Sequence, residues 1–131
     1  MAARTPPNMK RVEAIAATLP ESIRHDIEAW GDEPTFRVRG KNFVFANQEA
    51  TALSVKLPKE EAIAVVESDP LVEPTGYGLG RHGWISFHLP EDASEERWAE
   101  VTEWIETSYI LVAPKALSRE VLARIEAADA D

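Results

Sequence analysis

The strongest constraint on the fold is the period-two alternation within residues 33–46, EPTFRVRGKNFVFA. Successive side chains of a β-strand point to opposite faces, so Phe36 and Val38 take one side and the intervening arginines take the other. The RGKN sequence supplies a tight turn, after which Phe43 and Phe45 are expected to return to the apolar side. The segment therefore predicts a β-hairpin with one buried face and one open face.

The same alternation recurs in residues 51–57 and 84–89, which read TALSVKL and WISFHL. Each segment places three apolar residues on one side and polar or amphipathic residues on the other. Strands with polar outer positions are typical of an antiparallel sheet that has one covered face and one wet face.

Helical spacing on both sides of these strands supplies the expected cover. Apolar residues recur at i, i+3, i+4 and i+7 within residues 9–19, and residues 93–112 carry a stripe from Trp98 to Val112, with Asp92 and Glu95 placed like a capping box. Shorter helices are predicted for residues 23–30, 59–68 and the segment after Pro114. The fold class is therefore expected to be α+β, a two-layer sandwich with helices packed on one face of an antiparallel sheet.

A chain of 131 residues fits one domain. We expect a flexible leader at 1–8, the domain at 9–117 and a C-terminal helical tail at 118–131. No segment approaches the roughly 20 apolar residues that a membrane span needs, so no membrane partner and a cytoplasmic location are expected. The sequence has no cysteine, which excludes disulfides, thiolate metal sites and a cysteine nucleophile.

The motif of residues 78–83, GLGRHG, matches G-x-G-x-x-G but stands before a predicted strand instead of opening a helix. A dinucleotide site needs the opposite order, so the motif favours a hairpin loop in which glycine permits positive φ. An alternative stays open, in which the loop amides together with Arg81 and His82 receive a phosphate or a carboxylate.

Other patterns give little support for catalysis. The three histidines lack the spacing of a metal site, no Ser, His and Asp arrangement is recognisable, and Ser108 is expected to bond back to the carbonyl four residues earlier. Five glutamates on the last long helix indicate a solvated face, or else a site for a cation or a basic partner. We therefore expect a protein that is not an enzyme, with no cofactor and no metal.

Basic residues gather on the predicted open face although the chain carries a net charge of −9. Alternation places Arg37, Arg39, Lys56, Trp84 and His88 on that face, with Lys41 at its rim. A partly exposed tryptophan among cations is typical of a binding surface. The predicted binding residues are Arg37, Arg39, Lys41, Lys56, Arg81, His82, Trp84 and His88.

Several segments, in this order and spacing, resemble the MmcQ/YjbR family. They are PTFRVRGKNF at 34–43, SVKL at 54–57, HGWI at 82–85 and ETSY at 106–109, followed by Lys115. The resemblance covers nearly the whole chain and implies a frataxin-like (CyaY-like) fold. It also implies DNA binding through a proposed double-wing arrangement.

The resulting expectation is a small, non-enzymatic cytoplasmic protein that binds DNA through its basic sheet face and hairpin loops. The net charge of −9 disfavours DNA at long range, and no recognition helix rich in Arg or Lys is visible. The alternative is a protein–protein interaction module that uses the open sheet face, as frataxin-like sheets can, and has no nucleic-acid role.

Overall fold

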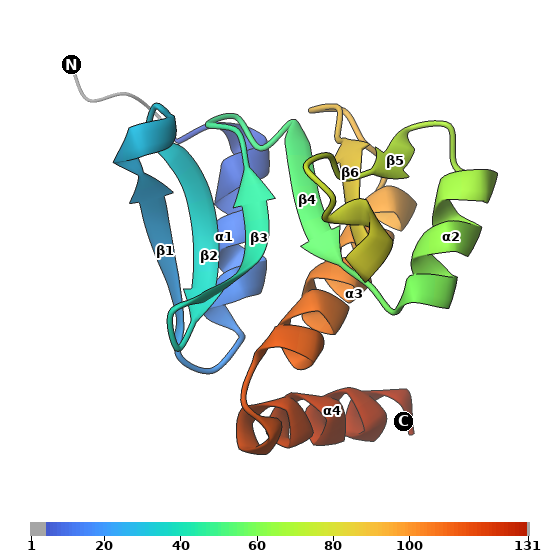
Figure 1. Cartoon of the computed structure of the whole chain (residues 1–131). Coiled ribbons are helices and arrows are strands. Elements are labelled where there is room, and N and C mark those ends of the chain that lie inside the picture. Colours follow the sequence, from blue (N-terminus) through green and yellow to red (C-terminus); the bar gives the residue numbers. More distant parts are fainter. Residues whose placement is uncertain (1–4, 131) are drawn as a thin grey trace.

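The computed structural model describes residues 5–130 and arranges them around one six-stranded antiparallel sheet of order β1-β2-β3-β4-β6-β5 (Figure 1). The elements in chain order are α1 (Pro7–Ala17), β1 (Ser22–Ile27), the 3₁₀ turn η1 (Glu28–Trp30), β2 (Glu33–Val38), β3 (Lys41–Ala46), β4 (Ala52–Lys56), α2 (Lys59–Ser68), β5 (Val72–Pro74), the 3₁₀ turn η2 (Gly80–His82), β6 (Trp84–His88), α3 (Glu95–Val112) and α4 (Lys115–Asp129).

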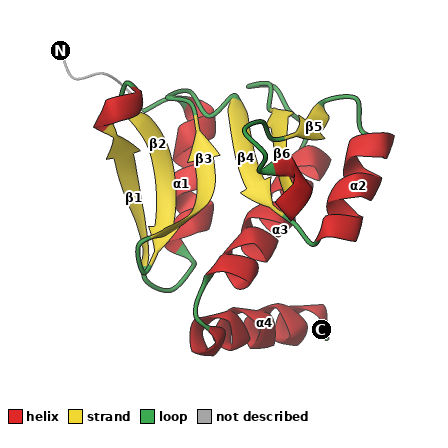
Figure 2. Ribbon diagram, viewed as in Figure 1, coloured by secondary structure: helices red, strands yellow, loops and turns green. Residues whose placement is uncertain are grey.

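The long helices α1 and α3 lie behind the sheet, and η2 lies in front of it (Figure 2). We call the side of α1 and α3 the covered face and the opposite side the outer face. Of the predicted stripe on α3, Trp98, Val101, Ile105 and Tyr109 are buried against the sheet, whereas Val112 is only partly buried. The predicted two-layer α+β sandwich is confirmed, with α2 packed beside the edge strand β5.

Residues 23–30 were expected to form a helical turn, and that prediction is wrong for most of the segment. Strand β1 pairs with β2 over its whole length, from Ser22 opposite Val38 to Ile27 opposite Glu33, and only η1 is helical. The local helix propensity of this segment is weak compared with the stabilisation from pairing six residues with β2, so the segment forms a strand.

A β-bulge separates the two phenylalanines of β3. Phe36 pairs with Val44 but Arg37 pairs with Asn42, so Phe43 is an extra residue in the ladder. Phe43 and Val44 therefore both face the covered side, and Phe45 is turned to the outer face. The expectation that Phe45 shares the apolar side with Phe43 is corrected by this one-residue shift.

The bulge also explains Ser108, which does not bond back along its own helix. Its hydroxyl donates to the Phe43 carbonyl at 2.6 Å and accepts from the Lys56 amide at 2.8 Å. On β3, pairing with β4 extends only from Val44 to Ala46. The Ser108 hydroxyl of α3 therefore replaces the hydrogen bonds that the two strands would otherwise form beyond Val44. A fully buried serine thus joins the two strands where they separate.

Both ends of the domain extend further than predicted. Residues 1–4 of the expected leader lie outside the described residues, but α1 already begins at Pro7, and buried Asn8 donates to the carbonyls of Ala50 and Leu89. Helix α4 begins inside the expected domain boundary and buries Val121. The tail of residues 118–131, as far as residue 130, is therefore mostly a docked helix.

Helix α3 is capped by Ser94, whose side chain accepts a hydrogen bond from the Arg97 amide, and not by the capping box predicted for Asp92 and Glu95. One turn into the helix, Arg97 Nη1 lies 2.7 Å from Asp69 Oδ2, although it is not aligned as a directed hydrogen bond. This mostly buried ion pair joins α3 to the end of α2.

Replacement of Asp69 by Asn should lower the free energy of unfolding by roughly 1 to 3 kcal/mol at neutral pH, because it leaves the mostly buried Arg97 charge with only the exposed Glu100 carboxylate, 3.5 Å away, as a partner. Contact with Arg97 lowers the pKa of Asp69, while burial acts in the opposite direction. A lowered folded-state pKa means that the stabilisation is present above the unfolded pKa and is lost as pH falls below about 4. Urea titrations should therefore show the two proteins converging in stability at acidic pH. A difference independent of pH would contradict this role.

Candidate functional site

The outer face carries a continuous row of aligned residues across all six strands. Pairing places His25 beside Thr35, Thr35 beside Phe45, and Phe45 beside Ser54. The row continues through Ser86 to Glu73. Partners in an antiparallel ladder share a face, so this row crosses the middle of the surface opposite the helices.

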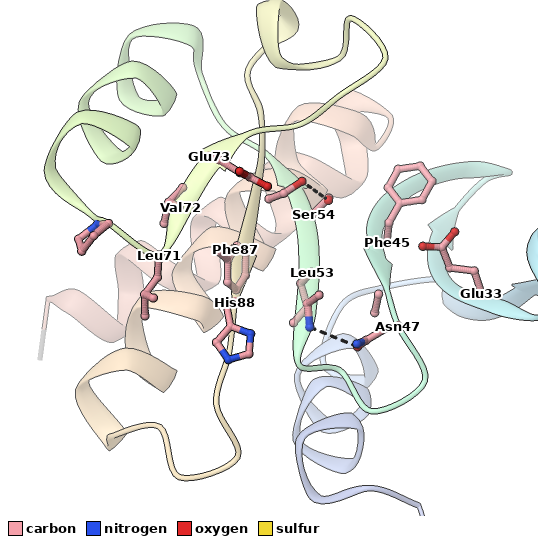
Figure 3. Close-up of a pocket in the computed structure, with 14 residues that line it drawn as sticks. Glu33, Phe45, Asn47, Leu53, Ser54, Leu71, Val72, Glu73, Phe87 and His88 are labelled. Carbon is pink, nitrogen blue, oxygen red and sulfur yellow. Dashed lines mark hydrogen bonds between the residues drawn. The ribbon is translucent and has the colours of Figure 1, made fainter.

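Two adjoining hollows occupy this part of the outer face, with volumes of about 450 Å³ and about 690 Å³. They share four lining residues, Glu33, Phe45, Ser54 and Ser86, and we call the combined depression the outer groove. The 450 Å³ hollow extends toward His88 and Leu71, as Figure 3 shows. The 690 Å³ hollow extends toward η1 and the loop of residues 75–79.

Three hydroxyl groups form a line on the floor of the outer groove. Ser54 and Ser86 share a hydrogen bond of 2.7 Å, and Ser86 shares a second one of 2.9 Å with Thr75. A hydroxyl has one donor hydrogen and two acceptor lone pairs, so acceptor capacity remains after both bonds are made. The floor is therefore polar between walls that are largely aromatic and aliphatic.

Aromatic rings form one wall of the outer groove. Trp30 stacks on Phe45 with ring centroids 6.4 Å apart, and Phe45 meets Trp84 edge to face at 5.4 Å. Trp30 is 58% exposed and Tyr77, at the rim, is fully exposed. Large exposed aromatic side chains beside a hollow are characteristic of binding surfaces.

The charge of the outer groove is acidic. Glu33 and Glu73 lie on opposite sides of Ser54 in Figure 3, and neither forms an ion pair within residues 5–130. Of the described residues, no lysine or arginine lines either hollow, and the histidine His88 is the one basic side chain in their lining.

The four predicted lysines and arginines between residues 37 and 56 are divided between two places. Arg37 and Lys56 lie at one end of the outer face, where Arg37 donates to Asn42 at 2.6 Å and Lys56 pairs with Trp84 in the ladder. Arg39 is in the turn with φ 50°, bound to Glu21, and together with Lys41 it borders Val112 to Pro114 on the helix side. Arg39 is thus not on the outer face, because the turn interrupts the alternation.

Trp84 lies on the outer face but is only 9% exposed, so the expectation of a partly exposed ring is corrected. The loop after β5 passes over this end of β6, and the Trp84 amide and carbonyl bond to Leu79 and Thr75. Phe45 contacts the edge of the indole ring. Trp84 therefore supports the aromatic wall instead of presenting a contact surface.

Residues 78–83 form the predicted hairpin loop between β5 and β6, with Gly78 at φ 78° and Gly83 at φ 93°. The alternative of an anion cradle finds little support, because most of the loop amides already donate within the loop. The donors are the amides of Leu79, Gly80, His82, Gly83 and Trp84. Arg81 and His82 are exposed on η2, where Arg81 donates to the Gly78 carbonyl.

Sequence patterns missed the aromatic and acidic parts of the outer groove. Trp30 was placed in a predicted helix, Phe45 on the covered face, and Tyr77 in an unassigned loop. The useful signal would have been Tyr77 between Gly76 and Gly78, since a large aromatic residue in a glycine loop has few means of being buried. On α3, Glu95 and Glu106 face Arg11 and Arg124, so that acidic run is partly satisfied within the protein.

Within residues 5–130, no group of three or more His, Cys, Asp or Glu side chains is arranged to hold a metal ion. None of the described helices combines the length and apolar character needed to cross a membrane.

A family model described as YjbR matches residues 17–111, which include every residue of the outer groove. None of the curated proteins compared with the sequence matches it. Among solved structures, the crystal structure of Deinococcus radiodurans protein DR2400, with a DUF419 domain, is similar in fold, with a TM-score of 0.66 and 22% sequence identity. The alignment covers 90% of this chain and 91% of that one.

Proposed function

The chain belongs to the YjbR family, and from the outer groove that lies within its family domain we propose that it is a small, non-enzymatic cytoplasmic protein that binds a segment of a partner protein. The observation that carries this proposal is the pairing of exposed aromatic residues with a polar, acidic floor. Protein interfaces are enriched in such aromatic anchors, whereas nucleic-acid interfaces are positively charged.

The two hollows together suit an extended polypeptide better than a compact ligand. They share their central residues and form one depression across the rows of β3, β4 and β6. Aliphatic contact comes from Leu71 at one end and aromatic contact from Trp30 at the other. Hydrogen-bond acceptors between the two ends can fix the register of a bound backbone or its polar side chains.

Selection of short random peptides against the folded protein tests this proposal. Peptides that bind the wild-type protein should lose about tenfold or more in affinity for the double variant Trp30→Ala, Tyr77→Ala, because aromatic hot spots contribute more than about 1 kcal/mol each. Both side chains are exposed, so the fold should be retained.

The matched control is Ile63→Ala, which removes an equally exposed apolar side chain on α2, away from the outer groove. Peptide affinity should be unchanged in this variant. If no peptide is enriched, or if the selected peptides bind the double variant as well as the wild type, the outer groove is not a site for polypeptide.

DNA binding is the second candidate, and it is supported by the cations at the other end of the outer face. Arg37 and Lys56 form no ion pair within the described residues, and Arg81 is exposed on η2, three residues before Trp84, the ladder partner of Lys56. These side chains would contact phosphates without reading bases.

Fluorescence anisotropy with a labelled duplex at several salt concentrations tests this candidate. Each phosphate contact should change the logarithm of the binding constant by about 0.9 for every tenfold change in salt. The variant Lys56→Ala should reduce that slope by about 1 relative to wild type. Binding that is absent at low salt, or that does not depend on salt, would exclude DNA as the ligand of this face.

A further inference from the structure

We propose that the 690 Å³ hollow of the outer groove is an arginine pocket, in which the guanidinium group of a partner's side chain is held against aromatic rings and a carboxylate. This inference rests on the proposed function and specifies the residue by which the partner segment is recognised.

Three aromatic residues line the hollow, and a planar cation could contact the ring faces that they turn toward it. Trp30, Phe45 and Tyr77 all line it, and the Trp30 and Phe45 rings are inclined by only 29°. The electron-rich face of an aromatic ring attracts a guanidinium group within about 6 Å of its centroid, and tryptophan does so most strongly. The protein itself uses this contact elsewhere, because the Arg11 guanidinium lies 4.4 Å from the centroid of Trp98.

Among the residues that the structure describes, the acid that lines this hollow has no cation of its own. Glu33 borders both hollows and is partly buried, yet it forms no ion pair within residues 5–130. Other acids of the protein do have such partners, for example Glu21 with Arg39 and Glu95 with Arg11. A partly enclosed carboxylate attracts an incoming cation more strongly than one in open solvent, because the local dielectric is lower.

The hydroxyl groups favour arginine over other cations. Ser54, Thr75 and Ser86 also line the hollow, and their two mutual hydrogen bonds leave mainly acceptor lone pairs free. A guanidinium group has five N–H donors and no acceptor, so it complements a carboxylate with nearby hydroxyl oxygens. An ammonium group is compact and not planar, so it would gain less from the flat faces of the aromatic rings that line the hollow.

A titration with N-acetyl-arginine methylamide, followed by NMR through the indole N–H of Trp30, tests the pocket. A saturable shift of this resonance is expected, and the citrulline analogue, which is nearly isosteric but neutral, should bind about tenfold more weakly or not at all. The resonance is assigned by its absence in Trp30→Phe.

Glu33→Gln should weaken the binding of the arginine probe by about fivefold or more while the thermal melt stays unchanged. Glu61→Gln, an exposed acid on α2, is the matched control and should have no effect. Equal affinity for arginine and citrulline probes, or undiminished arginine binding by Glu33→Gln, would overturn the inference.

The peptide selection separates this inference from the proposal on which it rests. Enriched peptides that bind the outer groove but lack a common arginine would refute the arginine pocket and leave the binding function intact. Failure to enrich any peptide would refute the binding function itself. Enriched peptides whose affinity is lost when a single arginine is replaced by citrulline would support both.

Discussion

Replacement of Gly83 by alanine is expected to destabilise the protein by roughly 3 to 5 kcal/mol, enough to unfold much of a marginally stable domain. Gly83 has φ 93° and ψ 4°, a region that side chains disfavour. An added Cβ would lie only 2.1 Å from the backbone oxygen of Leu57. Backbone shift cannot easily relieve this contact, because the Leu57 amide donates to the Gly83 carbonyl at 2.9 Å and the Leu57 side chain is buried.

Gly40→Ala is the matched control for this prediction. Gly40 also has a positive φ, 80°, but apart from Gly40 and its two chain neighbours, none of the described residues has an atom within 4 Å of the position that its Cβ would take. Gly40→Ala should therefore lower the free energy of unfolding only through the unfavourable backbone conformation, by about 1 kcal/mol. Urea titration of both variants measures the difference. Equal losses would mean that Gly83 is required only for its backbone angles and not for the close approach to Leu57.

Gly83 also shows which properties of the glycine motif at 78–83 can be predicted from the sequence and which cannot. Its position before a strand favoured a hairpin loop over a dinucleotide site, and the structure shows that loop between β5 and β6. The contact with Leu57 could not be predicted, because it joins residues 26 positions apart, at the end of one strand and the start of another. A sequence pattern can indicate that a glycine adopts a positive φ. It cannot indicate that Gly83 lies against the Leu57 backbone, because that contact results from the pairing of β4 with β6.

The core was largely predictable for the opposite reason. Val55, Ile85 and Phe87 alternate within their own strands, and Trp98 and Ile105 follow helical spacing, so each face is defined by nearby residues in the sequence. All five are buried as expected. Burial of these positions requires no knowledge of which strands are neighbours.

The outer groove was less predictable because two irregularities decide its composition. The bulge at Phe43 turns Phe45 outward and gives the face an aromatic centre where alternation predicted none. The turn at Gly40 removes Arg39 from the outer face and directs it to Glu21. One extra residue in a strand therefore adds an aromatic ring to the middle of the outer face, and one turn removes a cation from it, while Arg37 and Lys56 stay at its end.

The same bulge gives Ser108 a structural role that the periodicity of its helix does not indicate. Ser108→Ala is expected to lower the free energy of unfolding by roughly 2 to 5 kcal/mol. The substitution removes the partner of two backbone groups, the Phe43 carbonyl and the Lys56 amide. Each buried group left without a partner costs about 1 to 3 kcal/mol. Ser108 is fully buried, so solvent does not reach its hydroxyl in the folded state.

Thr102→Ala is the matched control, because Thr102 lies on the same helix and its hydroxyl donates to the Trp98 carbonyl four residues earlier. That carbonyl belongs to the helical ladder, so loss of the hydroxyl should cost less than about 1 kcal/mol. Ser108 was expected to make this kind of bond, and the two variants distinguish the alternatives directly. A loss at Ser108 no larger than that at Thr102 would show that the hydroxyl does not join β3 to β4.

Hydrogen exchange gives a local measurement of the same contact. In Ser108→Ala the Lys56 amide should exchange much faster than in wild type, while the amides of Val44 and Val55, within the paired part of β3 and β4, should change only with the global stability. The bulge that frees Phe45 for the outer groove also leaves the ladder incomplete at Phe43. We therefore expect Ser108→Ala to loosen the strand that positions Phe45, so that affinity for groove-binding peptides falls together with stability. Unchanged peptide affinity in folded Ser108→Ala would show that the shape of the outer groove is independent of this support.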